Sequence, residues 1–330
     1  MPEPTAILTN NVIETRGLGK QYGAIHALQS LDLRVPRQSI LGFLGPNGAG
    51  KSTAIKLLLG LARPTAGSAR VFDLDIRKQS LEIRRRVGYL SQEPRYYDSL
   101  TARETLRFAV RFFYSGPKSA LERRIQETIE LVGLAEKADR PIRGFSTGER
   151  QRLGIAQAQV HEPELLVLDE PAASLDPMGR HDVLDIMQRL REHGATVFYS
   201  THILDDVQRV SDAVAILNRG RLVAQGPLAE LLKNKADVTY TVAVDGNAEP
   251  TVQRLSAQPW VSRVDVLSRN GTTRLKVHVT DPSSADAHLL ETIAVGGSER
   301  VQEFTRDHLD LEQVFMNLVD GGTSDGASNR

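Results

Sequence analysis

The sequence predicts an α/β fold built on a mainly parallel β-sheet, with a small α+β domain after it. Apolar runs typical of buried strands occur at residues 39–44, 165–168, 196–199 and 213–217, and helix-forming segments separate them. Strands that alternate with helices imply parallel pairing. After residue 233 apolar and polar residues alternate instead, which predicts half-buried strands of a second domain.

Length, composition and charge narrow the class of protein. The 330 residues suggest two domains, and 40% apolar with 25% charged residues is typical of globular chains. The formal net charge is zero, which gives no electrostatic reason to expect a nucleic-acid partner. The chain has no cysteine, which excludes disulfides, thiolate zinc sites and cysteine nucleophiles.

The sequence predicts no membrane insertion of the chain itself. No run approaches the roughly 18 apolar residues of a membrane span. Residues 1–11 lack a basic segment followed by an apolar core, so they do not form a signal-peptide pattern. We therefore expect a soluble chain that reaches a membrane only through a partner.

Several further elements can be placed along the chain. Residues 12–44 predict short strands with turns, an N-terminal antiparallel β subdomain. Residues 94–140 predict mostly helix, and Thr101 with Glu104 forms a capping-box pattern at the start of one helix. Residues 218–220 predict the turn of a hairpin.

The most informative motif is a glycine, four residues, and then Gly-Lys-Ser. Its residues are Gly45, Pro46, Asn47, Gly48, Ala49, Gly50, Lys51, Ser52 and Thr53. An apolar strand precedes it and a helix-forming run follows it, which is the context of a phosphate-binding P-loop. The glycines let backbone N–H groups face the phosphates, and the helix N-terminus adds partial positive charge. Lys51 can reach the β- and γ-phosphates, and the Ser52 hydroxyl can bind Mg²⁺.

A second motif consists of two acids at the end of an apolar strand. Residues 165–168 lead directly into Asp169 and Glu170. An acid at the carboxyl end of a strand beside the P-loop strand lies where Mg²⁺ binds. We therefore expect Asp169 to hold the metal, mostly through water, and Glu170 to be the general base for the attacking water.

With these motifs in this order, the chain resembles the nucleotide-binding subunit of ABC transporters from about residue 12 to 230. Residues 145–152, Phe-Ser-Thr-Gly-Glu-Arg-Gln-Arg, match the ABC signature. The other matches are the Q-loop glutamine Gln92, the D-loop 174–176 with Asp176, the switch histidine His202 and the adenine-stacking aromatic Tyr22. Residues 311–315 resemble the tail of ABC-2-type, mostly export-associated, ATPases.

The resemblance implies an ATPase whose cofactors are ATP and Mg²⁺. It implies catalytic roles for Glu170, His202 and Lys51, and metal binding by Ser52, Gln92 and Asp169. It implies nucleotide contacts from Tyr22, the P-loop residues 45–53, Gln92, Ser146, Gly148, Glu149 and Asp176. In the family, the signature binds the nucleotide held by the opposite subunit, so we expect a homodimer or a pair with a similar subunit.

The resemblance also implies the domains and the membrane partner. It gives an ABC ATPase domain at 1–235 with a helical subdomain at about 94–150. The alternating pattern predicts the accessory domain at 236–320, and the Gly/Ser-rich composition predicts a disordered tail at 321–330. A permease would contact residues 93–115 and hold the chain at the cytoplasmic face of the cell membrane. Hydrolysis would then drive translocation of a substrate that the sequence does not identify, and the resemblance to export-associated ATPases implies export.

Six aromatic side chains follow Gln92, and two interpretations of them stay open. One is that they fill a small helical core, the other that they face the permease, and we expect each to hold for different residues of the set. Phe108 and Phe112 share a helical face, which predicts that some of the six pack inward. The set is Tyr96, Tyr97, Phe108, Phe112, Phe113 and Tyr114.

The signature departs from the commonest family form, Leu-Ser-Gly-Gly-Gln. Phe145, Thr147 and Glu149 replace the leucine, the first glycine and the glutamine. Ser146 and Gly148 remain, and we expect them to keep the phosphate contacts. Glu149 lies further into the helix, where we expect it to face solvent and complement the helix dipole.

Three alternative functions compete with transport. A soluble ABC ATPase of translation or DNA repair is disfavoured, because those usually carry two ATPase halves or a long coiled-coil insertion, and this chain has one P-loop and no long heptad run. A poorly hydrolysing regulatory module stays open because of the altered signature. A GTPase is disfavoured, because no Asn-Lys-x-Asp guanine-reading motif occurs.

Overall fold

The computed structural model describes residues 11–233, 238–245, 248–269, 272–294, 300–307, 311–312 and 315–316. The chain divides into two compact units, Met1–Ala229 and Glu230–Arg330. The predicted disordered tail 321–330 lies outside the described residues. Residues 313 and 314 of the predicted tail motif 311–315 lie outside them as well. Within the described part of the chain, no helix is both long and apolar enough to cross a membrane.

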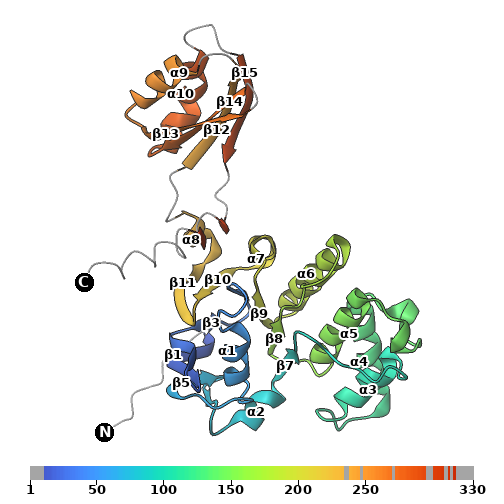
Figure 1. Ribbon diagram of the computed structural model, residues 1–330. Helices are drawn as coiled ribbons and strands as arrows, with labels where there is room; N and C mark the ends of the chain where they lie inside the picture. The colour runs from blue at the N-terminus through green and yellow to red at the C-terminus, as the bar shows by residue number, and fades with distance from the viewer. Residues whose placement is uncertain are drawn as a thin grey trace, which may run out of the picture. The chain divides into compact units, whose positions relative to one another are not determined.

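A six-stranded sheet organises the first unit (Figure 1). In spatial order its strands are β11 (Arg221–Pro227), β10 (Ala213–Asn218), β4 (Ile40–Leu44), β9 (Thr196–Thr201), β8 (Leu165–Asp169) and β7 (Val87–Leu90). All neighbours from β10 to β7 pair in parallel, and β11 adds an antiparallel edge through the predicted hairpin. The central strands are buried along their whole length, which explains their continuous apolar runs.

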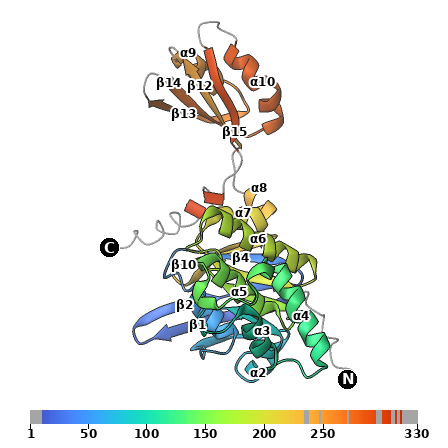
Figure 2. The same ribbon diagram turned by 90° about the vertical axis from the view of Figure 1, so that its right-hand side faces the viewer.

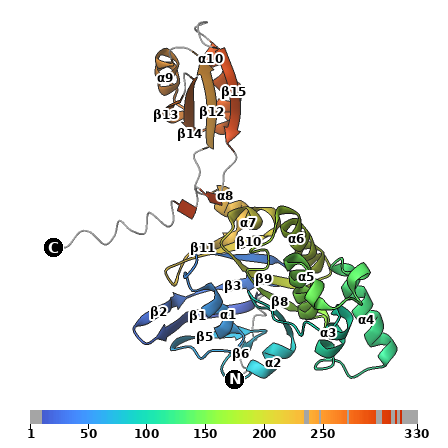
Figure 3. The same ribbon diagram turned by 45° about the vertical axis from the view of Figure 1, so that its right-hand side comes forward.

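An antiparallel sheet from the start of the chain lies beside the first (Figure 3). It contains β1 (Asn11–Tyr22), β2 (Ile25–Leu31), β3 (Arg34–Pro36), β5 (Ala66–Val71) and β6 (Leu74–Asp75). Helix α1 (Lys51–Leu58) contributes Ile55, Leu57 and Leu58 to one core with residues of both sheets. The P-loop helix is therefore anchored by apolar burial on its far side, while its N-terminus stays free for a ligand.

Helices cover the parallel sheet and form a separate helical part, drawn in green (Figure 2). In chain order they are α2 (Ser80–Arg85), α3 (Ala102–Val110), α4 (Lys118–Leu131), the 3-10 turns at 135–137 and 142–144, α5 (Thr147–Gln159), α6 (Pro177–Glu192), α7 (Leu204–Val210) and α8 (Leu228–Lys233). The predicted capping box of α3 is confirmed. The Glu104 N–H donates to Thr101 Oγ1 at 3.1 Å, and the Thr101 N–H donates to Glu104 Oε2 at 2.8 Å.

The segment 94–140 is mostly helical, as predicted, with α3, α4 and the 3-10 turn at 135–137, but its first helix begins later than residue 94. Residues 94–101 form no helix. Phe108 and Phe112 share a face and meet edge to face, with ring centroids 5.3 Å apart, but their side chains are 54% and 72% exposed. The reason is that α3 turns small and aliphatic residues inward, namely Ala102, Leu106, Ala109 and Val110.

One of the six aromatics does pack inward. Tyr96 is largely buried, and its hydroxyl donates to the Arg150 carbonyl at 2.9 Å. Tyr97, Phe113 and Tyr114 are exposed, like Phe108 and Phe112. The aromatic group is thus mainly a surface feature of the helical part.

The second unit is the predicted small α+β domain. Its elements are β12 (Val238–Asp245), α9 (Glu249–Ser256), β13 (Val261–Arg269), β14 (Thr272–Val279), α10 (Pro282–Ala294) and β15 (Arg300–Asp307). The strands form one antiparallel sheet in the order β13-β14-β12-β15, which is the split β-α-β arrangement. Leu255 and Leu289 of the helices share its core with Tyr240, Val242 and Leu275 of the sheet.

Candidate active site

The P-loop connects the end of β4 to the start of α1, and its shape depends on two glycines. Gly50 caps α1 with φ 108°, a left-handed conformation that glycine adopts without strain. A Cβ at Gly50 would lie 2.4 Å from the Ala27 carbonyl oxygen, and one at Gly45 would lie 2.3 Å from the Leu217 carbonyl oxygen. The loop can therefore press against its neighbours only because these positions lack side chains.

Parallel pairing brings the other predicted residues to the same edge of the sheet. Strand β9 lies between β4 and β8, with Thr201 opposite Leu44 and Ser200 opposite Asp169. The carboxyl ends of all three strands therefore meet beside the P-loop. Asp169, Glu170 and His202 arrive there from segments far apart in the sequence.

Lys51, Glu170 and His202 form a charged chain at this edge. Lys51 Nζ lies 3.1 Å from Glu170 Oε1, and His202 Nδ1 lies 2.9 Å from Glu170 Oε2. Lys51 is 6% exposed and Glu170 is 5% exposed. Lys51 also donates to the Gly45 carbonyl at 2.6 Å. A buried carboxylate is thus held between two basic groups, where it faces the P-loop.

Ser200 joins the two acids and was not predicted from the sequence. Its hydroxyl donates to Asp169 Oδ1 at 2.6 Å and accepts from the Glu170 N–H at 3.0 Å. Ser52 also donates to Asp169 Oδ1, at 3.3 Å. Glu170 has φ 52°, a left-handed conformation that costs energy for a residue with a side chain. The Ser200 bonds help to hold that conformation. A serine inside an apolar strand does not by itself indicate a site residue. Its contact with Asp169 follows only from the pairing of β9 with β8.

The P-loop borders a hollow of about 620 Å³. Its lining residues are Ile25, His26, Ala27, Gln29, residues 46–53, Gln92, Glu170, Arg219 and Gly220. The predicted P-loop residues, Gln92 and Glu170 therefore share one space. The residues from β2 and from the turn before β11 were not predicted, because only the fold brings these segments to the loop.

Tyr22 does not line this hollow. It lies at the end of β1, its side chain is 46% exposed, and Lys20 Nζ lies 4.6 Å from its ring centroid. Its predicted contact with adenine stays a prediction. Asp176 caps α6, where its side chain accepts from the Gly179 N–H at 3.0 Å.

The signature forms the start of α5, away from the hollow. Ser146 caps the helix, and its hydroxyl oxygen accepts from the Glu149 N–H at 3.3 Å. Glu149 Oε2 accepts from the Ser146 N–H at 3.0 Å, which completes a capping box. None of residues 145–152 is among the described residues that line the P-loop hollow.

The expectation that Glu149 faces solvent is wrong. Its side chain is only 8% exposed, because it folds back over the helix start and also forms an ion pair with Lys137. Burial by itself raises the pKa of Glu149, but Lys137, the Ser146 N–H and Arg152 outweigh it and hold that pKa below its usual value. Thr147 lies on the exposed first turn of α5, with no tight loop around it.

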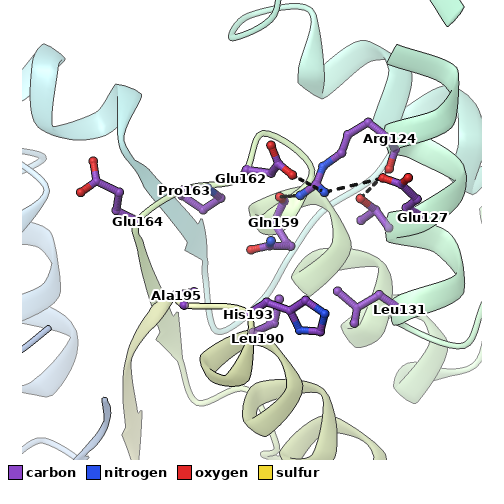
Figure 4. Close-up of a pocket in the computed structure, with 12 residues that line it drawn as sticks. Arg124, Glu127, Leu131, Gln159, Glu162, Pro163, Glu164, Leu190, His193 and Ala195 are labelled. Carbon is purple, nitrogen blue, oxygen red and sulfur yellow. Dashed lines mark hydrogen bonds and ion pairs between the residues drawn. The ribbon is translucent and has the colours of Figure 1, made fainter. Parts of the chain in front are cut away.

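A second hollow, of about 540 Å³, lies at the opposite edge of the sheet (Figure 4). Pro163, Glu164 and Ala195 line it just before β8 and β9 begin. Arg124 points into it but is already bonded, to Glu162 at 2.6 Å and to the Val160 carbonyl at 3.2 Å. The other carboxylates that line this hollow would repel an anion. Phosphate chemistry therefore belongs to the P-loop hollow.

Comparison with known proteins identifies the class. Residues 28–173 match the family model described as ABC transporter. The chain is 34% identical over 315 residues to a bacitracin transport ATP-binding protein of Bacillus licheniformis, covering 95% of this chain and 99% of the relative. It is 32% identical over 321 residues to the Nod factor export ATP-binding protein I of Ralstonia nicotianae, covering 96% and 97%.

A solved structure of the ATP-binding subunit of an ABC transporter is also similar. It is 32% identical, has a TM-score of 0.61 and covers 68% of this chain and 92% of its own. The chain belongs to the ABC transporter ATP-binding proteins. It binds ATP, and its enzymatic activity is ATP hydrolysis.

The variant Ser200→Ala tests how much the Ser200 hydroxyl stabilises this site. In Ser200→Ala, the Glu170 N–H loses one acceptor and Asp169 loses its shortest hydrogen bond. We expect the free energy of unfolding to fall by about 1–3 kcal/mol, because two hydrogen bonds of about 0.5–1.5 kcal/mol each are lost. Urea unfolding without nucleotide measures it. Ser99→Ala, at an exposed serine, is the control and should change stability by much less. Equal stability of the two variants would contradict the role of Ser200.

Proposed function

We propose that this chain hydrolyses Mg-ATP at the interface of a dimer and couples hydrolysis to export of a substrate by a membrane permease. The observation that carries the proposal is the position of Glu170, a buried carboxylate held between Lys51 and His202 beside the P-loop. An ionised carboxylate next to a phosphate site is suited to take a proton from water.

The residues of the site divide into metal, proton and phosphate roles. Ser52 and Asp169, whose side chains touch each other, and Gln92 at the hollow offer oxygen ligands of the kind that Mg²⁺ prefers. Mg²⁺, when bound, neutralises charge on the phosphate oxygens. Glu170 accepts the proton of the attacking water. His202 donates to Glu170 or to the γ-phosphate, and Lys51 compensates the charge that develops on the phosphate.

Binding of ATP requires Lys51 to change partners. In the structure, its ammonium group is fully used by the Gly45 carbonyl, the Pro46 carbonyl and Glu170. A bound phosphate offers stronger acceptors at the same loop. We propose that Lys51 moves toward the nucleotide and releases Glu170 for the water.

The position of the signature supports a site that two chains share. Ser146 and Thr147 are exposed, and α5 presents the N–H groups of its first turn to the surface. The Ser146 oxygen accepts within the capping box, so its hydroxyl hydrogen is free to donate. Because the described hollow contains no signature residue, we propose that this helix start contacts the nucleotide of a partner subunit.

An apolar groove of about 560 Å³ supports the contact with a permease. It lies between α2, α3 and α5, and Leu61, Leu81, Phe108 and Phe112 line it with more than half of each side chain exposed. Arg84 and Arg85 stand at its edge. We propose that a cytoplasmic helix of the permease lays its apolar face into this groove. The groove falls partly within residues 93–115, the predicted contact region.

The named relatives favour transport over the soluble alternatives. One is a bacitracin transport protein and the other a Nod factor export protein, and both align along nearly the whole chain, including its second unit. We therefore propose export and a place at the cytoplasmic face of the membrane, held by the permease. A poorly hydrolysing regulatory role is separated from this proposal by the turnover measurement below.

Glu170→Gln tests the general base. We expect hydrolysis to slow by about 10²- to 10⁴-fold, the usual contribution of a general base, while ATP still binds. Steady-state ATPase rates and nucleotide-induced shifts of the melting temperature measure the two effects. Lys51→Ala is the matched control, since it should lose both the activity and the melting shift. Near-normal turnover of Glu170→Gln would remove Glu170 from this role.

Mixed dimers test whether the signature acts on the partner's nucleotide. A Ser146→Arg subunit paired with a Lys51→Ala subunit leaves one interface doubly damaged and the other intact. We expect about half of the normal ATPase activity from the mixture's heterodimers, while each variant alone is inactive. Differently tagged subunits, purified in tandem, provide the sample. An inactive heterodimer, or an active Ser146→Arg homodimer, would contradict contact across the interface.

Charges in the groove test the permease contact. In the native host, the wild-type chain should sediment with membranes. The variant Phe108→Asp/Phe112→Asp should move to the soluble fraction, because carboxylates do not enter an apolar interface. Its ATPase activity in isolation should stay normal. Leu290→Asp, at an exposed position of α10, is the control and should stay with the membranes. Unchanged sedimentation of the double variant would exclude this groove.

A further inference from the structure

Glu149 places a negative charge at the start of the signature helix, beside the residues that are proposed to hold phosphate. Both of its carboxylate oxygens are occupied. Oε2 accepts from the Ser146 N–H at 3.0 Å, and Oε1 is bonded to Lys137. The side chain of Glu149 is buried, so water does little to screen its charge.

Lys137 comes from a different element and has no role among the sequence motifs. It ends the 3-10 turn at 135–137, and its side chain is 41% exposed. Its ammonium group forms an ion pair with the Glu149 carboxylate, so a residue outside the signature contacts the start of α5. Arg152 also lies near Glu149, but its guanidinium group forms an ion pair with Asp182 at 2.9 Å.

We infer that Lys137 is a positioning residue of the signature, which neutralises Glu149 and keeps its carboxylate folded back from the nucleotide of the partner subunit. The inference rests on the proposed function, because it needs the signature to meet a phosphate. Without Lys137, Glu149 keeps its capping bond to Ser146 but its charge is unpaired. An unpaired carboxylate there opposes the helix dipole's attraction for phosphate.

The same reasoning explains how this signature tolerates an acid. A glutamine at position 149 could make the same capping bond from its side-chain oxygen without adding charge. The acid therefore needs a nearby cation and a glutamine does not. Lys137 and Glu149 form a unit, and the effect of changing one depends on the other.

A double-mutant cycle on ATPase kinetics tests the inference. Lys137→Met should raise the KM for Mg-ATP about tenfold, less than the roughly 30-fold or more expected for a fully buried charge pair, because the Lys137 side chain is 41% exposed. In the Glu149→Gln background, the same Lys137→Met change should alter the KM by less than about twofold, because no charge is then left unpaired. Lys118→Met, at another lysine of the helical part, is the control and should have no effect. The tenfold difference should shrink as salt is raised, because it comes from an unpaired charge.

Melting temperatures of all variants separate a structural effect from the proposed one. A Lys137→Met variant that melts lower but keeps its KM would overturn the inference, as would a KM defect that Glu149→Gln does not restore. Failure of the proposed function gives a different pattern. In that case the wild-type chain itself hydrolyses no ATP, or Ser146→Arg keeps full activity whatever stands at position 137.

Discussion

The active site depends on one constraint, the parallel pairing of β9 between β4 and β8. That pairing fixes Thr201 opposite Leu44 and Ser200 opposite Asp169, so three strand ends meet at one edge. A shift of β9 by one residue would turn the Ser200 side chain away from Asp169. The apolar burial of all three strands is what prevents such a shift, and the chemistry of the site therefore rests on the core beneath it.

Charge balance is the second feature that the site and the signature share. The carboxylate of Glu170 lies between two basic groups, and the carboxylate of Glu149 lies between a cation and a backbone N–H. In both places a buried acid would be costly alone and is stable because each oxygen has a partner. The two arrangements differ in their proposed roles: Glu170 is released for chemistry when ATP binds, whereas Glu149 keeps its position.

The two units of the chain differ in how well function can be assigned to them. The first carries the P-loop, both acids, the signature and the apolar groove. The second has a complete core of its own in a split β-α-β fold, and its exposed residues include Val266, Leu267 and Phe304. Relatives of transport and export systems align across both units, so the second belongs to the architecture of this group of subunits.

The sequence by itself determined the fold class, the P-loop and the family, because each depends on residues that are neighbours in the chain. Gly50, Lys51 and Ser52 act as one local motif, and Asp169 and Glu170 end one strand. Tertiary structure decided which separate segments meet. It paired Ser200 with Asp169, brought Lys137 onto Glu149, and turned Phe108 and Phe112 outward. The physical reason is that such contacts depend on strand register and on which of two competing apolar helix faces meets a core, and one stretch of sequence does not decide between them.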